Sequence, residues 1–385
     1  MLAARICLIR HFIYDLHLRR EAEALADAGY LVDVICTVDK PELPSAYPGI
    51  RFFALPEGDD PEGFWTRAWS YMSFFCRAAW RVTRLHFRHR YVLIQVTSMP
   101  DFLVFATLIP RLCGAKVLAF LKEPSPELGA MLYGRGVAFL LRQVEWLVLK
   151  YAQRIITVTE QMKKLYLTRG GSPEKIEVVL NVPDERHLPA QPGEQPDLRS
   201  GSFTLLYHGT VEERYGHDLL LQAVALARDA VPVLRLRISG RGTFQPRVEE
   251  MVAELGLQDC VEIMGFLPQD EVAAVIAAAD IGVVAQKSSP YANLVHTTKM
   301  YEFLMFGKPV LANCLQSVLY YFPEGVLQYY DTDCPQSMAR TIAELYRRPE
   351  LRASLAERGM KTYRELCWAL QKQTYLSAVR AAIGG

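Results

Sequence analysis

The sequence has no cysteine pattern that could hold a metal ion or a disulfide framework. Its eight cysteines are scattered, with no C-x-x-C pair and no histidine at ligand spacing. Zinc modules need closely spaced ligands, and small disulfide-stabilised domains need a dense set of cysteines. Both classes are therefore excluded, and we expect a reducing, cytoplasmic location.

Charge of one sign is not in excess either. The chain contains 43 Lys and Arg against 42 Asp and Glu, a net charge of +1. A chain with this charge balance has no overall electrostatic attraction for nucleic acid, so any charged partner must bind at a local patch of charge. No segment resembles a nucleic-acid-binding motif, and we expect no nucleic-acid partner.

Long uninterrupted apolar runs are also missing. The most hydrophobic window, 91–110, contains Pro100 and Asp101, whereas a spanning helix needs ~20 mostly apolar residues. The apolar run at the start, 1–10, is interrupted by charged residues and is too short for a signal peptide. We expect neither a transmembrane helix nor a signal peptide, and attachment to the inner face of a membrane stays open.

Short apolar runs alternate with helical periods, which predicts an α/β protein. With 385 residues, 51% of them hydrophobic, two domains are expected. Apolar strands that alternate with helices predict parallel sheets covered on both faces. The expected strands are 6–9, 31–36, 91–96, 116–120, 154–158 and 176–180, then 203–208, 234–239, 261–264, 281–285 and 309–313.

A break at 181–202 separates the two halves. It holds four Pro, two Gly and few apolar residues, a composition typical of linkers. We predict an N-terminal domain at 1–185, a linker at 186–202 and a C-terminal domain at 203–365. The fold class is two doubly wound, Rossmann-like domains facing a cleft, where ligands bind at the carboxyl ends of the strands.

Two glycine-containing turns follow strands of the second half. Gly209 ends the first strand and Arg214 lies shortly after it; Gly240-Arg241-Gly242 follows the second strand. Glycine lets a ligand approach the backbone, and an arginine can grip a phosphate with two hydrogen bonds. The alternative is a pair of ordinary strand-to-helix turns with surface arginines.

The segment 297–310 is the most specific pattern in the chain. It predicts an N-cap at Thr297 or Thr298, a short helix, a C-cap at Gly307 and then a strand. Lys299 in the first turn opposes the helix dipole unless an anion binds there. Glu302 lies one turn later, where a carboxylate could accept hydrogen bonds from a ribose diol. The alternative is a solvated lysine and a helix-surface glutamate.

Together these motifs resemble the donor site of retaining glycosyltransferases of family 4, which have the two-domain fold called GT-B. The resemblance covers nearly the whole chain, and the motifs occur in the family's order. It rests on Thr298-Lys299-x-x-Glu302, Gly307-Lys308-Pro309-Val310, His208-Gly209, Arg214-Tyr215-Gly216, Gly240-x-Gly242 and 261–268, and in the first half on Asp15, 19–25, 28–30, 99–104, 114–117 and 173–181. It also implies that a last helix, 366–385, packs back on the N-terminal domain.

The resemblance implies transfer of a sugar from a nucleotide-sugar to an acceptor hydroxyl, with retained configuration and without a metal or other cofactor. Arg214 and Lys299 would neutralise the diphosphate, and Glu302 would hold the ribose. The implied donor site comprises Gly209, Thr210, Arg214, Gly240, Arg241, Gly265, Phe266, Leu267, Leu294, Val295, Thr298, Lys299 and Glu302. The stretch 265–267 would contact the base, and backbone N–H groups of 295–298 would donate hydrogen bonds to the phosphates.

The chain departs from the family pattern at several positions. Leu294 replaces a common glutamate, while Lys122 and Phe120 replace a histidine and an aspartate on the acceptor side. Either Lys122 or Glu123 lines the acceptor site and is catalytic together with Arg214 and Lys299, or activity is reduced or lost. The first interpretation is an enzyme that uses UDP-sugar, or else GDP-sugar, and a glycan or lipid-linked acceptor in surface polysaccharide or glycolipid assembly. A nucleotide-binding partner subunit and, less favoured, a GT-B epimerase are the alternatives.

The tripeptide Asp331-Thr332-Asp333 has the D-x-D form that holds a metal in other glycosyltransferases. Here it stands between an expected strand, 326–330, and a helix. We interpret it as a turn and an N-cap, and predict no metal site.

The segment 63–91 is rich in aromatic and basic residues and has no acidic residue. Such a helix can lie on an anionic membrane surface or border a lipid-linked acceptor. The alternative is an ordinary helix that packs its aromatic side chains on the sheet and leaves its arginines in water.

Overall fold

The computed structural model describes residues 4–13, 16–38, 47–56, 64–188 and 201–384. It divides into two compact units, of which unit 1 comprises Met1–Asn181 with Ala369–Gly385, and unit 2 comprises Val182–Trp368. Residues 189–200 of the predicted linker lie outside the described residues. Each unit is built on one sheet.

The sheet of unit 1 is entirely parallel, with the strand order β3-β2-β1-β4-β5-β6-β7. Its strands are β1 (Arg5–Ile13), β2 (Leu31–Val38), β3 (Ile50–Pro56), β4 (Leu93–Thr97), β5 (Lys116–Leu121), β6 (Arg154–Thr157) and β7 (Ile176–Val178). The six predicted strands are confirmed, and β3 was missed. As an edge strand, β3 is half exposed and tolerates a terminal proline, so it lacks the continuous apolar run of a buried strand.

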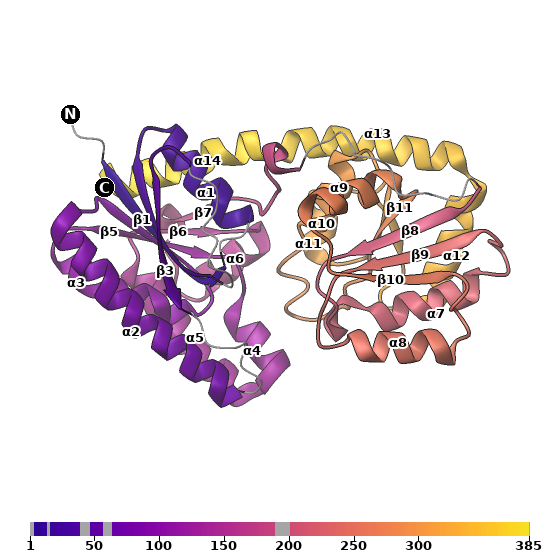
Figure 1. The fold of residues 1–385 in the computed structure, drawn as a ribbon, viewed down its shortest axis with the longest axis horizontal. Helices are drawn as coiled ribbons and strands as arrows, with labels where there is room; N and C mark the ends of the chain where they lie inside the picture. The colour runs from indigo at the N-terminus through magenta and orange to yellow at the C-terminus, as the bar shows by residue number, and fades with distance from the viewer. Residues whose placement is uncertain (1–3, 14–15, 39–46, 57–63, 189–200, 385) are drawn as a thin grey trace. The chain divides into compact units, whose positions relative to one another are not determined.

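Helices cover both faces of this sheet. They are α1 (Leu16–Asp27), α2 (Phe64–His89), η1 (Asp101–Thr107), α3 (Leu108–Leu112), α4 (Ser125–Tyr133), α5 (Arg135–Tyr151), α6 (Glu160–Thr168) and α14 (Trp368–Gly384), with the short turn η2 (Pro173–Lys175) before β7. Helices α2, α3 and α5 lie on one face, and α1 and α14 on the other (Figure 1). Among the described helices, none is both long and apolar enough to cross a bilayer.

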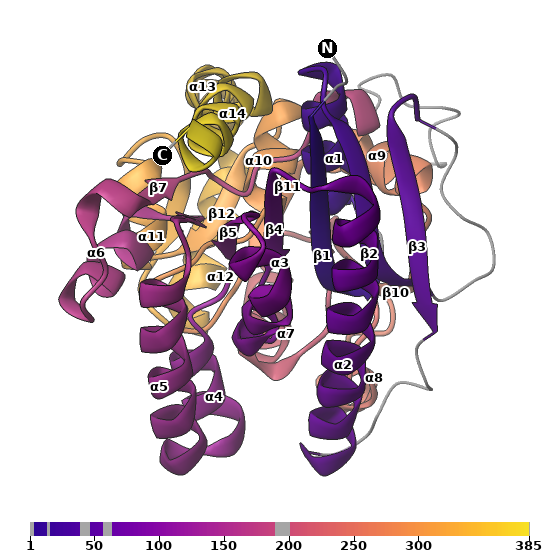
Figure 2. The ribbon, with the colours of Figure 1, turned by 90° about the vertical axis from the view of Figure 1, so that its left-hand side faces the viewer.

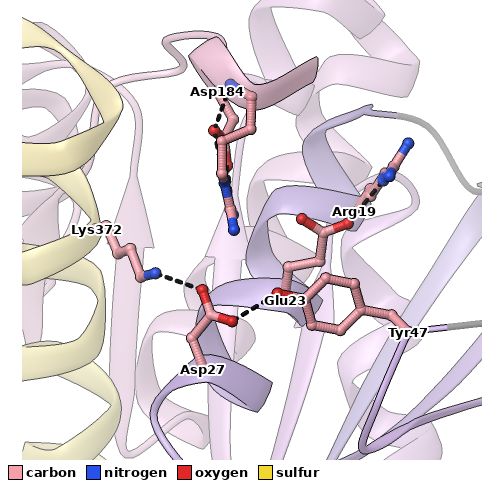
Figure 3. A network of polar contacts seen from close by, with 7 residues as sticks. Arg19, Glu23, Asp27, Tyr47, Asp184 and Lys372 are labelled. Atoms are coloured by element: carbon pink, nitrogen blue, oxygen red, sulfur yellow. Dashed lines mark hydrogen bonds and ion pairs between the residues drawn. The ribbon is translucent and has the colours of Figure 1, made fainter.

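The C-terminal helix α14 belongs to unit 1 and is bound to it by polar contacts. The Tyr375 hydroxyl donates to Gln95 Oε1 of β4 at 2.8 Å. Asp27, which ends α1, accepts hydrogen bonds from Lys372 Nζ at 2.7 Å and from the Tyr47 hydroxyl at 2.6 Å (Figure 3). Side chains far apart in the sequence thus fix the last helix against β4 and α1.

Unit 2 repeats the doubly wound pattern with six parallel strands in the order β10-β9-β8-β11-β12-β13. The strands are β8 (Phe203–His208), β9 (Leu234–Ser239), β10 (Val261–Gly265), β11 (Ile281–Val284), β12 (Val310–Asn313) and β13 (Gln328–Tyr330). The predicted strands of this half are confirmed, as is the prediction of two doubly wound α/β sheets.

The helices of unit 2 flank its sheet in the same way. They are the short turns η3 (Glu185–His187) and η4 (Glu213–Tyr215), then α7 (His217–Ala227), α8 (Gln245–Glu254), α9 (Gln269–Ala278), α10 (Lys299–Met305), α11 (Gln316–Tyr321), α12 (Pro335–Arg347) and α13 (Pro349–Leu366). Leu205, Leu221, Val283 and Ile342 are fully buried in the core between β8, β11, α7 and α12. Such side chains each contribute about 1.5–3 kcal/mol by burial.

The strand order of unit 2 reverses at β8. The chain moves outward from β8 to β9 and β10, then crosses to β11 on the other side of β8. In open parallel sheets the connections at such a reversal separate, and ligands bind beyond the carboxyl ends of the central strands. The turns after β8 and β9 and the segment before α10 are therefore the place to look for a site.

Candidate functional site

The turns after β8 and β9 touch each other through their backbones. Gly209 N donates to Ser239 O at 2.8 Å, and Gly209 and Gly240 have φ values of +121° and +145°. A Cβ built on Gly240 would lie 1.7 Å from Gly209 O. Only glycine fits here, because any side chain would enter the neighbouring backbone and both φ values are unfavourable for other residues.

Lys299, the first residue of α10, passes directly over Gly209. A Cβ on Gly209 would lie 1.7 Å from Lys299 Cε and 2.3 Å from its Nζ. The ammonium also lies 3.4 Å from Thr297 Oγ1. The glycine of one predicted motif is therefore needed for the lysine of another, and the sequence predicted both for the same site.

Arg214 and Lys299 meet at the ring of Tyr215. Arg214 Cζ lies 4.9 Å from the ring centroid, and Lys299 Nζ lies 5.3 Å from it. The turn η4, which carries Arg214, is fixed by Gly216, where a Cβ would lie 2.0 Å from Ala285 O. Burial lowers the pKa of Lys299, and the charge of Arg214 lowers it further. Two cations held together in this way favour an anion between them.

A histidine and a glutamate lie beside the two cations. His208 Nε2 is 3.2 Å from Glu302 Oε2, and the two side chains are 8% and 14% exposed. Burial, and then the charge of Lys299, lowers the pKa of His208 to about 3. Burial raises the pKa of Glu302 to about 7, although Lys299 opposes this shift. His208 was not among the predicted site residues; its position at the end of β8, next to Gly209, was the signal.

The predicted base-binding stretch lies at the end of β10. Gly265 has a φ of +70°, and its carbonyl accepts a hydrogen bond from Gly240 N at 2.7 Å. Phe266 is 66% exposed, and Arg241 Cζ lies 5.8 Å from its ring centroid. An exposed ring with a guanidinium beside it offers a surface on which a planar base can stack. Leu267 follows and is half-buried.

The predicted segment 294–298 precedes α10 rather than starting it. Thr298 is the N-cap residue, but its side chain makes no capping hydrogen bond and its backbone is already helical. The carbonyl of Val295 accepts a hydrogen bond from Ser317 Oγ at 2.8 Å. The predicted position of the cap is confirmed at Thr298. The hydroxyl that accepts hydrogen bonds at this helix start is that of Thr297, which lies 3.4 Å from both the backbone N and the Nζ of Lys299. The helix ends as predicted before Gly307, whose φ of +63° is left-handed, but the C-cap residue is Phe306.

Two further predicted positions flank this region. Thr210 is exposed, and its carbonyl accepts a hydrogen bond from the Tyr207 hydroxyl at 2.7 Å. Leu294 is half-buried, and its N–H donates to Tyr291 O at 3.0 Å. The Leu294 side chain cannot form the hydrogen bonds that the glutamate common in the family would form there.

The D-x-D tripeptide is a structural turn. Asp333 Oδ1 accepts hydrogen bonds from Asn313 Nδ2 at 2.7 Å and from Ser288 N at 3.0 Å. Asp331 lies 3.8 Å from Arg340 at the surface. The predicted turn is confirmed, and the predicted N-cap is wrong, since Cys334 occupies the N-cap position of α12 without a side-chain bond.

Lys122, predicted to line an acceptor site, is instead part of a buried ion pair within unit 1. Its Nζ lies 2.7 Å from Glu21 Oε1, with 8% and 0% of the two side chains exposed. Gln95 Nε2 donates to the other Glu21 oxygen at 2.7 Å. Phe120 is fully buried, and Lys122 Nζ lies 4.7 Å from its ring. The ammonium is neutralised because α1, β4 and β5 pack their polar groups together here.

Glu123 has a different surrounding. It is half-buried, and its charge acts on the buried carboxyl of Asp101, the first residue of η1. Burial is the main cause that raises the pKa of Asp101 to about 6; the nearby Ser125 side chain lowers this pKa, and the charge of Glu123 raises it. The burial of Asp101 was not predicted, since a lone aspartate after a proline gives no sequence signal for burial.

Comparisons with known proteins agree with this architecture. The family model described as Glycosyl transferase 4-like domain matches residues 15–181, and the model described as Glycosyl transferases group 1 matches residues 193–362. The sucrose-phosphate synthase of Thermosynechococcus elongatus is similar in fold, with a TM-score of 0.79, 19% identity and 98% of both chains covered. Anabaena HepE in complex with UDP-glucose has a TM-score of 0.75 and 15% identity, covering 98% of this chain and 99% of HepE.

A curated relative is similar in sequence. The D-inositol 3-phosphate glycosyltransferase of Streptosporangium roseum is 29% identical over 231 residues, which cover 54% of this chain and 50% of the relative. The chain thus spans about half the length of the curated relatives it matches. The chain therefore has two Rossmann-like domains of the GT-B fold, the first matching a glycosyltransferase 4-like domain and the second a group 1 glycosyltransferase domain.

Proposed function

We propose that the chain transfers a sugar from a nucleotide-sugar to an acceptor hydroxyl, with retention of configuration and without a metal ion. The observation that carries the proposal is the convergence of Arg214 and Lys299 on the Tyr215 ring, directly over Gly209. Two cations next to a side-chain-free turn suit a diphosphate, because they can neutralise it while the glycine leaves room for it.

The two cations would act mainly on the leaving group. As the bond from the anomeric carbon to the diphosphate oxygen breaks, its electron pair moves to that oxygen and negative charge develops there. The acceptor oxygen bonds to the anomeric carbon on the same face, and its proton passes to the departing diphosphate. Each hydrogen-bond donor that points at the developing charge typically increases the turnover rate by about 10²–10³-fold. Arg214 and Lys299 would thus supply what a metal ion supplies elsewhere.

The surrounding residues would orient the donor. Glu302 lies near Lys299 and would accept hydrogen bonds from the ribose diol. Phe266 and Arg241 would stack on the base. We propose UDP as the nucleotide, with GDP as the second choice, since HepE, which is similar in fold, has been solved with UDP-glucose. A glycan or lipid-linked acceptor and a cytoplasmic location complete the proposal.

Calorimetric titration with UDP tests the donor site. Arg214→Ala and Lys299→Ala should each weaken binding by tenfold or more, because a hydrogen bond to a charged group contributes about 1.5–3 kcal/mol. Arg247→Ala is the matched control, since Arg247 lies on α8 and pairs only within that helix. Unchanged affinity in both site variants would refute the proposal.

One observation favours a second candidate, a nucleotide-binding partner subunit without turnover. Lys122 is buried in its ion pair with Glu21, and Phe120 is fully buried. Neither of these replacements on the acceptor side offers a free acid or base. Hydrolysis of UDP-sugar, measured as release of UDP, separates the two candidates: release at a rate above the Lys299→Ala background favours the enzyme, and tight binding without release favours the subunit.

A further inference from the structure

One face of unit 1 exposes an unusual amount of apolar surface. Of the nineteen large hydrophobic side chains that are exposed in the described chain, fourteen lie on α2, α3, α4 and α5. Of these fourteen side chains, the most exposed are Trp69, Trp80, Leu112, Phe139 and Leu140. Helices α2, α3 and α5 lie on the same side of the sheet in both views (Figures 1 and 2), and η1, which leads into α3, contacts both α2 and α5. Apolar patches of this extent mark interaction surfaces.

Helix α2 has two apolar stripes rather than one. Phe74, Ala78, Val82 and Leu85 are buried and pack towards the sheet. Trp69, Met72, Cys76, Trp80, Arg84 and Phe87 recur three or four residues apart and are all exposed, so they form a second stripe on the outer side. The helix therefore satisfies its packing with one set of side chains and presents another set to the surroundings.

An apolar groove lies between α2 and α3. It has a volume of about 450 Å³ and is lined by Trp80, Arg84, Phe105, Leu108 and Ile109, with smaller residues between them. Leu108 and Ile109 are each 49% exposed at its rim. The one charged group in its lining, Arg84, has its Cζ 5.3 Å from the Trp80 ring centroid. The groove thus combines an apolar floor with a cation at its edge.

The charge on this face has a single sign. Between Thr66 and Tyr151, a stretch described throughout, none of the four acidic residues is exposed. Asp101 and Glu145 are buried, Glu127 pairs with Arg169, and Glu123 is half-buried. Seven cationic side chains of the same stretch are exposed, among them Arg77, Arg84, Arg88, Arg135, Arg142 and Lys150. The face formed by α2, α3 and α5 is therefore both apolar and cationic.

We propose that the face formed by α2, α3 and α5 docks on an anionic phospholipid bilayer. Tryptophans and leucines on an outer helix stripe enter the headgroup region, and exposed arginines attract anionic lipid. This charge complementarity argues for a lipid surface, because protein interfaces tend to exclude charge from their core. The inference extends the contact predicted for 63–91 to three helices, and it is independent of the proposed reaction.

Vesicle sedimentation tests the docking of the whole chain. The protein should bind vesicles of phosphatidylglycerol and phosphatidylcholine, bind pure phosphatidylcholine weakly, and lose affinity as salt rises. Exchange of Arg84, Arg88 and Arg142 for Gln should weaken binding by about fivefold for each cation removed. Sedimentation that is equal for both vesicle types, or absent, would overturn the proposal.

Tryptophan fluorescence tests which face enters the lipid. Two variants are compared, one retaining Trp80 and the other retaining Trp368, with the other four tryptophans replaced by Phe. Trp80 is 59% exposed and Trp368 is 2% exposed. Brominated lipid should quench Trp80 strongly and Trp368 little. Equal quenching would contradict docking through this face.

An apolar exchange completes the test. Trp80→Ser with Leu112→Ser and Phe139→Ser should abolish vesicle binding, whereas Leu226→Ser with Leu319→Ser and Tyr320→Ser, on exposed positions of unit 2, should leave it unchanged. Circular dichroism establishes that both triple variants are folded. If the unmodified protein formed dimers through this face without binding vesicles, the face would belong to a second copy and the proposal would be wrong.

Discussion

The side chain of Lys299 crosses Gly209 so closely that a β-carbon there would lie 1.7 Å from Lys299 Cε. The two residues are 90 positions apart, yet each sets a condition on the other. Gly209 must lack a side chain for the ammonium to reach the Tyr215 ring, where Arg214 also lies. This relationship makes a substitution at the glycine a test of the lysine.

Exchange of Gly209 for alanine should displace the ammonium of Lys299. We expect Gly209→Ala to weaken UDP binding at least tenfold, since a charged hydrogen bond contributes about 1.5–3 kcal/mol. Its φ of +121° adds strain of about 1–3 kcal/mol to the folded state. Calorimetry measures the affinity, and urea unfolding measures the stability.

The control for this exchange is Gly256→Ala in the same unit. Gly256 has a φ of +63° and no neighbour within 4 Å of a built Cβ. It should lose stability through strain alone and bind UDP as the unmodified protein does. Equal affinities for the two variants would contradict the role assigned to Lys299.

The neighbours His208 and Glu302 should influence stability with opposite dependence on pH. Burial raises the pKa of Glu302 from 4.5 to about 7, so between these values the folded protein holds a proton that the unfolded chain releases. Stability from this group therefore falls as pH rises. Burial and Lys299 lower the pKa of His208 from 6.5 to about 3, so stability from this group rises with pH across that range.

Single variants should separate the two opposing slopes. From about pH 4.5 to 6.5, the free energy of unfolding of Glu302→Gln should rise more steeply with pH than that of the unmodified protein, and that of His208→Gln should rise less steeply or fall. Each slope can reach about 1.4 kcal/mol per pH unit at most. Urea unfolding at several pH values measures them, and the same slope in both variants would exclude the assigned protonation states.

The buried ion pair of Lys122 and Glu21 should be important for stability. Lys122→Ala leaves the Glu21 carboxylate buried without its cation, which typically costs about 3–5 kcal/mol. Lys372→Ala is the control, because Lys372 and Asp27 are 26% and 32% exposed and such pairs contribute about 0–1 kcal/mol. Thermal and urea unfolding give both values. A Lys122→Ala protein as stable as the control would show that the pair is not formed.

The two aspartates of the D-x-D tripeptide should differ in their effect. Asp333→Ala removes the acceptor of Asn313 Nδ2 and Ser288 N, which should cost about 1–3 kcal/mol of stability. Asp331→Ala, at a side chain 78% exposed, should change stability by less than about 0.5 kcal/mol.

Removal of divalent ions completes that comparison. With excess EDTA, UDP affinity should stay the same in the unmodified protein and in both variants, because Arg214 and Lys299 carry the positive charge of the proposed site. A loss of UDP binding in EDTA that Mg²⁺ or Mn²⁺ restores, and that Asp331→Ala and Asp333→Ala share, would contradict this interpretation.

Local patterns were sufficient to predict which residues come together at the carboxyl ends of the strands of unit 2. Gly209, Gly240 and Gly265 stand at strand ends in the sequence, and Lys299 and Glu302 stand one turn apart in a short helix. Parallel strands bring their carboxyl ends to one edge of a sheet, so residues at several strand ends converge without further information. His208 was within reach of the same argument, since it ends β8.

The acceptor side could not be predicted in the same way. Lys122 was expected to line the acceptor site because it stands where the family has a histidine, but its ammonium pairs with Glu21, which is 101 positions away. This contact depends on α1 covering the same face of the sheet on which β5 presents Lys122. Likewise, the aromatic composition of α2 left open which side chains are buried, since core and surface stripes have the same helical spacing.

The sequence by itself determined the alternation of strands and helices, the glycine turns and the composition of the cationic motif. These follow from backbone sterics and from apolar runs, which act over a few residues. Only the tertiary structure decided that Arg214 and Lys299 share one ring, that Lys122 is buried, and that three helices expose a common apolar face. Such contacts are set by strand order and by which sheet face each helix covers, and these emerge only when the whole core is packed.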